Sequence, residues 1–481
     1  MKHSHSTRCD VAVIGAGPAG IVAALRAADL GAKTVLVARG NFGGMAANDG
    51  PVPVRTLAHA ARLLRDARQL GRYGVATGEM TLDYATLLSR VQEVVGEARA
   101  QSSFRRQLDD LGVDVRERSG PAQFVDSHTV LASAWPALRA DSIIVCTGGA
   151  SRKLPIPGFE LTSTHSDAWS LKAVPSSMLV IGGGATGAQV ASVFNGFGTR
   201  VRLFQAGPRI LPAEDVDVSA AVADGFRAAG IEVVQDFGEI RRFERIGAGV
   251  RMSYEKDGVR HCAEAELAVV AVGWAANTAE LKPAAAGIAL DDRGFIKVDS
   301  RLQSSVDHIY AAGDAIGRMM LVPQAIQGGF IAATNAVHGP TLAVDEQAAP
   351  IGSFTDPEYA QVGLTEAQAR SRHRVVTASI RFDSTTRTII DGRTGGFCKL
   401  IVDDSSHRIL GCHIVGERAV ETAQLAAVAM AGGMTVDALA RVPLSYPTHG
   451  AVLGRVAAKV AHELSGPGAP GAGSVDRYLP N

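Results

Sequence analysis

A repeated unit built around a glycine-rich turn constrains the fold of this chain of 481 residues more than any other feature. In its first copy, the apolar run 11–14 leads into Gly15-Ala16-Gly17-Pro18-Ala19-Gly20, and a helical pattern follows over 21–30. Gly31 is suited to cap that helix, and the run 33–37 reads as the next strand. Strand, G-x-G-x-x-G turn, helix and strand at this spacing predict a βαβ unit.

The second copy repeats the same order further along the chain. The run 177–181 leads into Gly182-Gly183-Gly184-Ala185-Thr186-Gly187, a helix reaches Asn195, and the strand 201–204 closes the unit. One such motif is weak evidence, but two in matching contexts strongly favour a pair of dinucleotide-binding folds with parallel sheets.

The chemistry expected of both turns is pyrophosphate binding, because glycines let the backbone approach the ligand and the helix N-terminus supplies N–H donors. The alternative is a tight turn that binds nothing. The predicted contacts are Gly15, Gly17, Pro18, Ala19 and Gly20 in the first copy, and Gly182, Gly184, Ala185, Thr186 and Gly187 in the second.

Composition excludes several classes of protein. Lys+Arg and Asp+Glu both number 48, which argues against a general nucleic-acid binder. The 5 cysteines are too few for a disulfide scaffold. The chain has no apolar run long enough for a membrane span and no secretion signal at its N-terminus, and no metal site is evident. We therefore expect a cytoplasmic protein.

The rest of the chain mixes helical and strand-like segments. A long helical stretch rich in Ala, Leu and Arg is expected over 53–111, and the segment from 465 to 481 is expected to be disordered. Strand-like runs end in glycine turns at 141–148 and 309–314, and later strands at 397–403 and 409–415 precede helices at 421–431 and 436–440.

These features together resemble the FAD-dependent pyridine nucleotide-disulfide oxidoreductases over about residues 9–464. Besides the two glycine motifs, the resemblance depends on Thr147-Gly148, Tyr310-Ala-Ala-Gly-Asp314, Phe354-Thr-Asp-Pro357 and Val362-Gly-Leu-Thr365. It implies an α/β fold with two doubly wound, Rossmann-like domains and a C-terminal α+β dimerisation domain. The implied domains are FAD-binding (1–160 and 288–345), NAD(P)-binding (161–287) and dimerisation (346–464).

The resemblance also implies FAD, NADH or NADPH as co-substrate, and a homodimer whose active site is shared between chains. Asp314 would bind the ribityl chain, and Leu321 and Val322 would lie near the isoalloxazine. Further FAD or nucleotide contacts implied are Arg39, Gly43, Gly44, Met45, Ala46, Ala122, Thr147, Gly148, Gly313, Gln205 and Gly273.

The redox-active cysteine pair of the family has no counterpart in the matching segment, residues 44–56. Ala46 and Pro51 stand at the two cysteine positions, and neither can form a thiolate or a mixed disulfide. The chain's cysteines all lie elsewhere, at Cys9, Cys146, Cys262, Cys398 and Cys412, and are expected to be small buried side chains. The sequence therefore predicts that thiol–disulfide chemistry is lost.

Other positions that serve the thiols in the family differ too. Tyr446 stands in place of the acid/base His and Ala451 in place of its Glu, so a phenol (pKa about 10) replaces an imidazole (about 6.5). Arg55 and Gln189 replace a Lys–Glu pair beside the flavin; Arg55 either stabilises negative charge there or is structural. His449 follows in the same segment, as either a proton donor or an interface histidine.

Three departures concern the cofactors. Ala38 replaces the acidic residue expected on the FAD ribose, which leaves that contact to the backbone or to Arg39. Gln205 stands where Glu would select NADH, and Arg209 either reaches a 2′-phosphate or belongs to a turn. Trp274 replaces an Arg near the nucleotide, where it either stacks on the cofactor or packs.

The function predicted is an FAD-dependent NAD(P)H oxidoreductase that passes electrons directly from reduced flavin to a diffusible acceptor such as a quinone. The resemblance is to a branch of the family without the cysteine pair, similar to flavoprotein quinone reductases, with Tyr446, His449, Arg55 and Gln189 as candidate catalytic residues. Two alternatives remain open. One is flavin-dependent oxidation or reduction of a specialised metabolite, and the other is a non-catalytic dimer that binds FAD or nucleotide.

Overall fold

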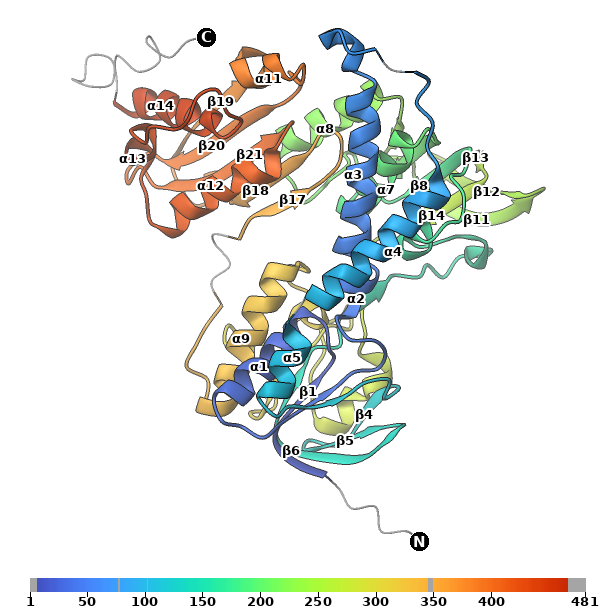
Figure 1. The fold of residues 1–481 in the computed structure, drawn as a ribbon, viewed down its shortest axis with the longest axis vertical. Coiled ribbons are helices and arrows are strands. Elements are labelled where there is room, and N and C mark those ends of the chain that lie inside the picture. The colour runs from blue at the N-terminus through green and yellow to red at the C-terminus, as the bar shows by residue number, and fades with distance from the viewer. Residues whose placement is uncertain (1–6, 77, 102, 345–348, 466–481) are drawn as a thin grey trace. The chain divides into compact units, whose positions relative to one another are not determined.

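The computed structural model describes residues 7–76, 78–101, 103–344 and 349–465. The chain divides into two compact units. The first comprises 1–57, 85–152 and 273–345, and the second comprises 58–84, 153–272 and 346–481 (Figure 1). The helix α3 (Pro51–Ala67) contributes residues 51–57 to the first unit and 58–67 to the second. The finer domain boundaries expected from the sequence stay a prediction.

The first unit is built on a seven-stranded sheet in the order β3-β2-β1-β6-β5-β4, with β16 also paired to β6. The pairs β3–β2, β2–β1, β1–β6 and β6–β16 are parallel, and β4 and β5 add an antiparallel edge. The strands are β1 (Thr7–Ile14), β2 (Thr34–Val37), β3 (Asp114–Arg116), β4 (Ala122–Asp126), β5 (Thr129–Ala132), β6 (Trp135–Val145) and β16 (Ile309–Ala311).

Helices complete this unit. They are α1 (Pro18–Asp29), α2 (Gly44–Asn48), α4 (Tyr84–Gln101), α5 (Phe104–Asp110) and α9 (Val322–His338). Small residues let α1 and α9 pack closely (Figure 1): a Cβ on Gly329 would lie only 2.1 Å from the carbonyl oxygen of Ala19. A short antiparallel pair, β7 (Gly149–Ser151) and β15 (Trp274–Ala276), lies in the same unit.

The second unit contains a parallel four-stranded sheet in the order β10-β9-β8-β14. Its strands are β8 (Ser177–Ile181), β9 (Arg200–Gln205), β10 (Glu232–Gln235) and β14 (Leu267–Val270), and its helices are α6 (His165–Trp169), α7 (Ala185–Gly196) and α8 (Val216–Ala228). An antiparallel three-stranded sheet follows, formed by β11 (Glu239–Ile246), β12 (Gly249–Lys256) and β13 (Val259–Ala265).

The C-terminal part of the second unit is an antiparallel sheet in the order β17-β18-β21-β20-β19, with its own core. The strands are β17 (Ile351–Ser353), β18 (Tyr359–Gly363), β19 (Val375–Arg381), β20 (Phe397–Asp403) and β21 (Ile409–Val415). The helices are α10 (Glu366–Arg370), α11 (Thr386–Ile390), α12 (Ala419–Ala431), α13 (Val436–Ala440) and α14 (Ala451–Ser465). Two parallel-sheet folds and a C-terminal α+β part confirm the predicted fold class.

Some expected elements differ from the observed ones. The stretch 53–111 is not one continuous helix, because the chain leaves the helical path after α3 and Gly74 adopts φ +74°. The helix α1 begins at Pro18 rather than Ile21, since proline fits the first helical turn. Of the predicted disordered tail, Ser465 ends α14, and the remainder lies outside the described residues. No helix in the described ranges is long and apolar enough to cross a membrane.

Candidate functional site

The first glycine motif forms the turn between β1 and α1. Gly15 has φ +111°, and a Cβ there would lie 2.1 Å from the carbonyl oxygen of Cys146. A Cβ on Gly20 would lie 1.7 Å from the carbonyl oxygen of Gly15. Around Gly17, by contrast, a Cβ would meet nothing within 4 Å. The outer glycines close the turn against the sheet, and the middle one leaves room for a ligand, as a dinucleotide loop requires.

The helix that follows is open to an anion at its N-terminus. Gly17 is the N-cap of α1 and makes no side-chain cap hydrogen bond, and the first turn carries no acidic residue. Its backbone N–H groups are therefore available to a pyrophosphate, which the helix dipole also favours.

Two polar groups of the first unit fit a bound FAD. The Oγ1 atom of Thr147 is buried, and none of the described residues is a hydrogen-bond partner for it. Burial raises the pKa of Asp314, which lies beside β7, where a Cβ on Gly149 would be 3.5 Å from the Cβ of Asp314. Hydroxyl groups of a ribityl chain would supply the donors that such a carboxylate needs.

The segment that matches the family's redox pair packs on the first glycine turn. A Cβ on Gly44 would lie 2.7 Å from the Cα of Gly17, so α2 touches the turn directly. Ala46 lies within α2, and Pro51 is the first residue of α3. Asn48 fixes the segment by donating from Nδ2 to the Gly44 carbonyl at 2.6 Å. The positions beside the predicted flavin site therefore carry a methyl group and a pyrrolidine ring.

The cysteines are free, and most of them are protected from ionisation. Burial raises the pKa of Cys9 and of Cys146 to about 12. A hydrogen bond to Cys412 and burial hold the pKa of Cys398 well above its usual range. Cys262 alone among the five is exposed. Since the thiolate is the reactive form, the thiols of Cys9, Cys146 and Cys398 are poor nucleophiles.

The position where an acidic residue is expected to contact the FAD ribose is apolar and buried. Ala38 is buried at the end of β2, and the guanidinium of its neighbour Arg39 forms an ion pair with Glu280. The predicted contact from Arg39 to the ribose would have to compete with this pair. Ala122 opens the strand β4.

The second glycine motif has the same geometry as the first. Gly182 has φ +104°, a Cβ on Gly187 would lie 1.8 Å from the Gly182 carbonyl oxygen, and nothing lies within 4 Å of a Cβ on Gly184. Gly184 caps α7 without a side-chain hydrogen bond. Gln205, at the end of β9, accepts a hydrogen bond at its Oε1 from the Gly183 amide at 2.8 Å.

Two other candidates near the nucleotide have structural contacts. Arg209 donates from Nη1 to the Glu214 carbonyl and from Nη2 to the Pro212 carbonyl, both at 2.8 Å, so it braces a turn. Trp274 is half-buried in β15 opposite Ser151. Gly273 precedes it, with φ +109°.

The remaining candidates come from separate places in the chain. Arg55 lies on α3 in the first unit, and Gln189 lies on α7 in the second. Tyr446 and His449 both follow α13 in the second unit. The Tyr446 side chain is 60% exposed, and its hydroxyl lies 2.8 Å from Thr386 Oγ1.

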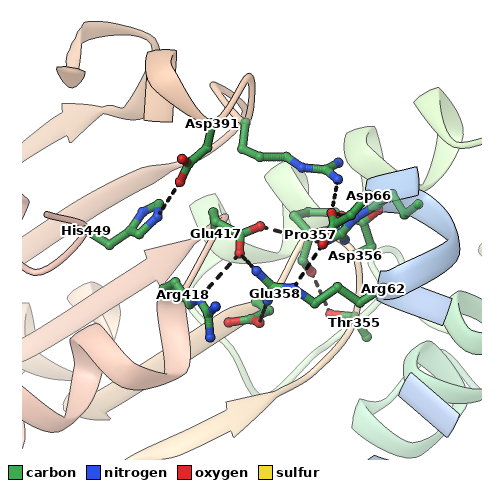
Figure 2. Close-up of polar contacts among 12 residues, drawn as sticks. Arg62, Asp66, Thr355, Asp356, Pro357, Glu358, Asp391, Glu417, Arg418 and His449 are labelled. Atoms are coloured by element: carbon green, nitrogen blue, oxygen red, sulfur yellow. Dashed lines mark hydrogen bonds and ion pairs between the residues drawn. The ribbon is translucent and has the colours of Figure 1, made fainter. Parts of the chain in front are cut away.

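His449 belongs to a hydrogen-bonded pair that the sequence did not predict. Its Nε2 lies 2.9 Å from Asp391 Oδ2 (Figure 2). The same oxygen accepts a hydrogen bond from Arg387 Nε at 3.0 Å. The His449 side chain is only 13% exposed, and its Nδ1 is buried without a hydrogen-bond partner among the described residues. Burial lowers the pKa of His449, and Asp391 partly offsets this.

A network of charged residues in the second unit holds the loop that carries Asp391. Arg62 on α3 pairs with Glu358 at 3.2 Å and with Glu417, and Arg65 pairs with Asp356. Arg393 forms an ion pair with Asp66.

Glu417 is the most enclosed of these carboxylates, with 7% of its side chain exposed, and burial together with Glu417 raises the pKa of Glu358. Tyr73 adds a hydrogen bond to the Ile390 carbonyl at 2.8 Å. Nothing in the local sequence around Asp391 signals these contacts, since the partners are distant in sequence.

Comparisons with known proteins place the chain in a family. The sequence profile of the pyridine nucleotide-disulphide oxidoreductases matches residues 9–329, and the profile of their dimerisation domain matches residues 349–457. Exposed apolar residues on α12, among them Val428 at 73% exposure, agree with a surface that dimerises.

Individual relatives agree. The chain is 32% identical over 463 residues to a dihydrolipoyl dehydrogenase of Geobacillus stearothermophilus, covering 94% of this chain and 96% of that one. It is 32% identical over 446 residues to a mercuric reductase of Lysinibacillus sphaericus, covering 91% and 80%.

A solved structure also matches over most of the fold. The Cu(II) complex of the HOCl-induced flavoprotein disulfide reductase RclA from Escherichia coli superposes with a TM-score of 0.84 at 25% identity, covering 94% of this chain and 100% of that one. This chain therefore belongs to the pyridine nucleotide-disulphide oxidoreductase family, flavoproteins that typically bind FAD and use NAD(P)H.

Proposed function

We propose that this protein is an FAD-dependent NAD(P)H oxidoreductase without a redox disulfide, which passes electrons directly to a diffusible acceptor such as a quinone. The observation that carries the proposal is the pair Ala46 and Pro51 in the segment packed on the first glycine turn. Neither residue carries a thiol, and Cys9, Cys146 and Cys398, which lie elsewhere, have raised pKa values.

FAD, when bound, supplies the carrier that accepts a hydride from NAD(P)H and releases two electrons to the acceptor. The chain's part is to hold the two nucleotides. The turn at Gly15–Gly20 and the N-terminus of α1 bind the FAD pyrophosphate, and Thr147 and Asp314 bind its hydroxyl groups. The turn at Gly182–Gly187 binds the nicotinamide nucleotide.

Where the electron acceptor is reduced, we propose that the Tyr446 hydroxyl takes the role of the family's acid/base histidine. The reaction consumes NAD(P)H, a proton and a quinone, and gives NAD(P)⁺ and a hydroquinone. Because the hydride carries one hydrogen nucleus and two electrons, the hydroquinone needs one more proton, which comes from solvent and can be relayed by a protein group. The exposed Tyr446 hydroxyl, bonded to Thr386, is the group suited to deliver it, with Tyr446 of each chain serving the partner's site in a homodimer.

The test is steady-state oxidation of NADH and NADPH by the FAD-loaded protein with menadione as acceptor. We expect turnover with menadione and none with lipoamide or glutathione disulfide. Absence of quinone turnover, or robust disulfide turnover, would contradict the proposal. Bleaching of the flavin by NADH under anaerobic conditions separates an enzyme from a non-catalytic binding protein, whose flavin would stay oxidised.

One observation favours a second candidate, flavin-dependent oxidation of a specialised metabolite. Since Asp391 can only accept a hydrogen bond, the His449 proton resides on Nε2, and Nδ1 keeps a lone pair. With its pKa lowered by burial, His449 is neutral at pH 7 and suited to act as a base. Rapid bleaching of the FAD by a metabolite, but not by NADH, would favour this candidate.

A further inference from the structure

A cavity of about 290 Å³ lies in the C-terminal part of the second unit, beside Tyr446. This volume is at the lower end of small-molecule sites. Residues from three places line it: Thr385–Arg387 at the start of α11, the loop from Ala440 to Thr448, and the first turns of α14, including Ala451, Val452, Gly454 and Arg455. His449 is not among the lining residues, although Arg387, which pairs with Asp391, is one of them.

The charges on the cavity wall have one sign. Arg387, Arg441 and Arg455 line it, and none of its lining residues is Asp or Glu. Arg387 is neutralised by Asp391 at 3.0 Å. The other two have only backbone partners in the described chain: Arg441 donates to the Asp437 carbonyl at 3.0 Å, and Arg455 to the Ser384 carbonyl at 2.7 Å.

One donor atom at the cavity is left unused. The Nε of Arg455 is buried, and within the described ranges it has no hydrogen-bond partner. A buried guanidinium N–H without an acceptor is costly, so the described chain does not fully compensate Arg455. Two arginines without a carboxylate partner therefore give the cavity a net positive charge.

The remaining wall is mostly apolar. Val442, Pro443, Leu444, Pro447 and Val452 supply hydrocarbon surface. The hydroxyl groups of Thr386 and Tyr446, bonded to each other at 2.8 Å, lie at the same cavity. Such a wall suits a flat ring, with the arginines available to a charged substituent and the hydroxyls to a ring oxygen.

We infer that this cavity binds a planar aromatic molecule carrying a carboxylate or sulfonate group. The inference rests on the proposed function, because Tyr446 lines the cavity, and it identifies the electron acceptor as an anionic quinone. Arg441 and Arg455 select the charged substituent, and Tyr446 lies next to the ring. The enzyme would then prefer a sulfonated quinone to a neutral one of the same size.

Binding is tested first, without any electron transfer. Naphthalene-2-sulfonate, which cannot accept electrons from flavin, is titrated into the oxidised FAD-loaded protein by calorimetry. The double variant Arg441→Gln/Arg455→Gln should bind it at least about 10-fold more weakly, the loss expected from charged hydrogen bonds. The control variant Arg374→Gln, at an arginine 89% exposed in the same C-terminal part, should bind it as the wild type does.

Turnover is tested second, with 1,4-naphthoquinone-2-sulfonate and menadione as acceptors. The double variant should lower the ratio of kcat/KM for the sulfonate over that for menadione about 10-fold, and anaerobic bleaching by NADH should stay unchanged. If the wild type does not bind naphthalene-2-sulfonate, or binds it equally well in the double variant, the site is refuted. Arginine-dependent binding without turnover of any quinone would instead refute the proposed function and leave the site in place.

Discussion

The Nε2 atom of His449 lies 2.9 Å from Oδ2 of Asp391, although the two residues are far apart in sequence. Both side chains are largely buried within the second unit, and Arg387 neutralises the Asp391 carboxylate. Burial lowers the pKa of His449, and it also lowers the pKa of His413, a buried residue of β21 whose Nε2 bonds to the Leu364 carbonyl at 2.9 Å. Both imidazoles are therefore neutral in the folded protein at pH 7.

This gives a prediction for the pH dependence of stability. In the unfolded chain a histidine binds a proton near pH 6.5, while in the folded protein His449 and His413 bind one only at lower pH. Their stabilising contribution is complete above about pH 6.5 and is lost as pH falls through the lowered folded values. The melting temperature, followed by calorimetry from pH 8 to pH 5, should fall less steeply in His449→Gln and in His413→Gln than in the wild type.

The variants must be compared with the wild type by how steeply the melting temperature changes with pH, because the buried Glu214 changes stability in the opposite direction. Burial raises the pKa of Glu214 to about 7, so its contribution to stability is lost as pH rises from about 4.5 to 7. Glu214 is present in the wild type and in both variants, so its effect cancels when the slope of a variant is subtracted from that of the wild type. If the melting temperatures of the wild type and both variants fell equally steeply with pH, His449 and His413 would not be neutral in the folded protein.

The second prediction concerns thiol reagents. After anaerobic reduction with NADH, treatment with iodoacetamide at pH 8 should leave quinone reduction intact, because the pKa values of Cys9 and Cys146 are about 12 and that of Cys398 is also raised. Mass spectrometry should find the label on the exposed Cys262. The variant Cys262→Ser serves as the control and should resist labelling. Loss of turnover in step with labelling of a buried cysteine would contradict the proposal of thiol-free electron transfer.

The third prediction concerns the choice between NADH and NADPH. In Gln205→Glu the carboxylate can still accept from the Gly183 amide, and it can also accept from a ribose 2′-hydroxyl while repelling a 2′-phosphate. The ratio of kcat/KM for NADH over NADPH should rise about 10-fold, corresponding to about 1.4 kcal/mol. The matched variant Gln205→Ala removes the hydrogen bond to the Gly183 amide and should weaken the binding of both NADH and NADPH. An unchanged ratio in Gln205→Glu would mean that residue 205 does not face the ribose.

Much of the fold could be predicted from the sequence because the signals are local. The strands β8, β20 and β21 have the predicted bounds, since short apolar runs ended by turn residues mark them. Both glycine motifs form the expected turns, because Gly15 and Gly182 need a positive φ and a close approach that only glycine allows. The start of α1 at Pro18 was missed, since the sequence predicted Ile21, although a proline in the first helical turn is the signal that marks it.

The unpredicted features depend on contacts between distant parts of the chain. The partnership of His449 with Asp391 requires the loop after α11 to lie beside the loop before α14, and no periodic pattern encodes that. The structure also separates two residues that the sequence treated alike: Tyr446 is exposed at the cavity, while His449 is enclosed and paired. Tertiary packing, rather than local sequence, decides how far each of them is exposed.

The last prediction concerns the ion network of the second unit. Arg62 neutralises Glu417, of which 7% is exposed, and contacts Glu358 at 3.2 Å. Removing one partner of a buried pair leaves a charge without compensation, so Arg62→Ala should lower the free energy of unfolding by about 3 kcal/mol. The exposed pair of Arg374 and Asp404, 2.9 Å apart, provides the control: Arg374→Ala should cost at most about 0.5 kcal/mol. Urea denaturation of both variants measures the two values.

The pH dependence of the decrease in unfolding free energy in Arg62→Ala distinguishes the loss of a charge from the loss of packing. Burial and the neighbouring Glu417 already raise the pKa of Glu358, and without Arg62 it rises further, so Glu358 of Arg62→Ala can become neutral in mild acid. The destabilisation should therefore be smaller at pH 5 than at pH 8. A loss that is equal at both pH values would mean that the Arg62 side chain stabilises the second unit through its hydrocarbon stem, and that Glu417 finds adequate compensation in Arg65 and Arg418, which lie 3.6 and 3.7 Å from it.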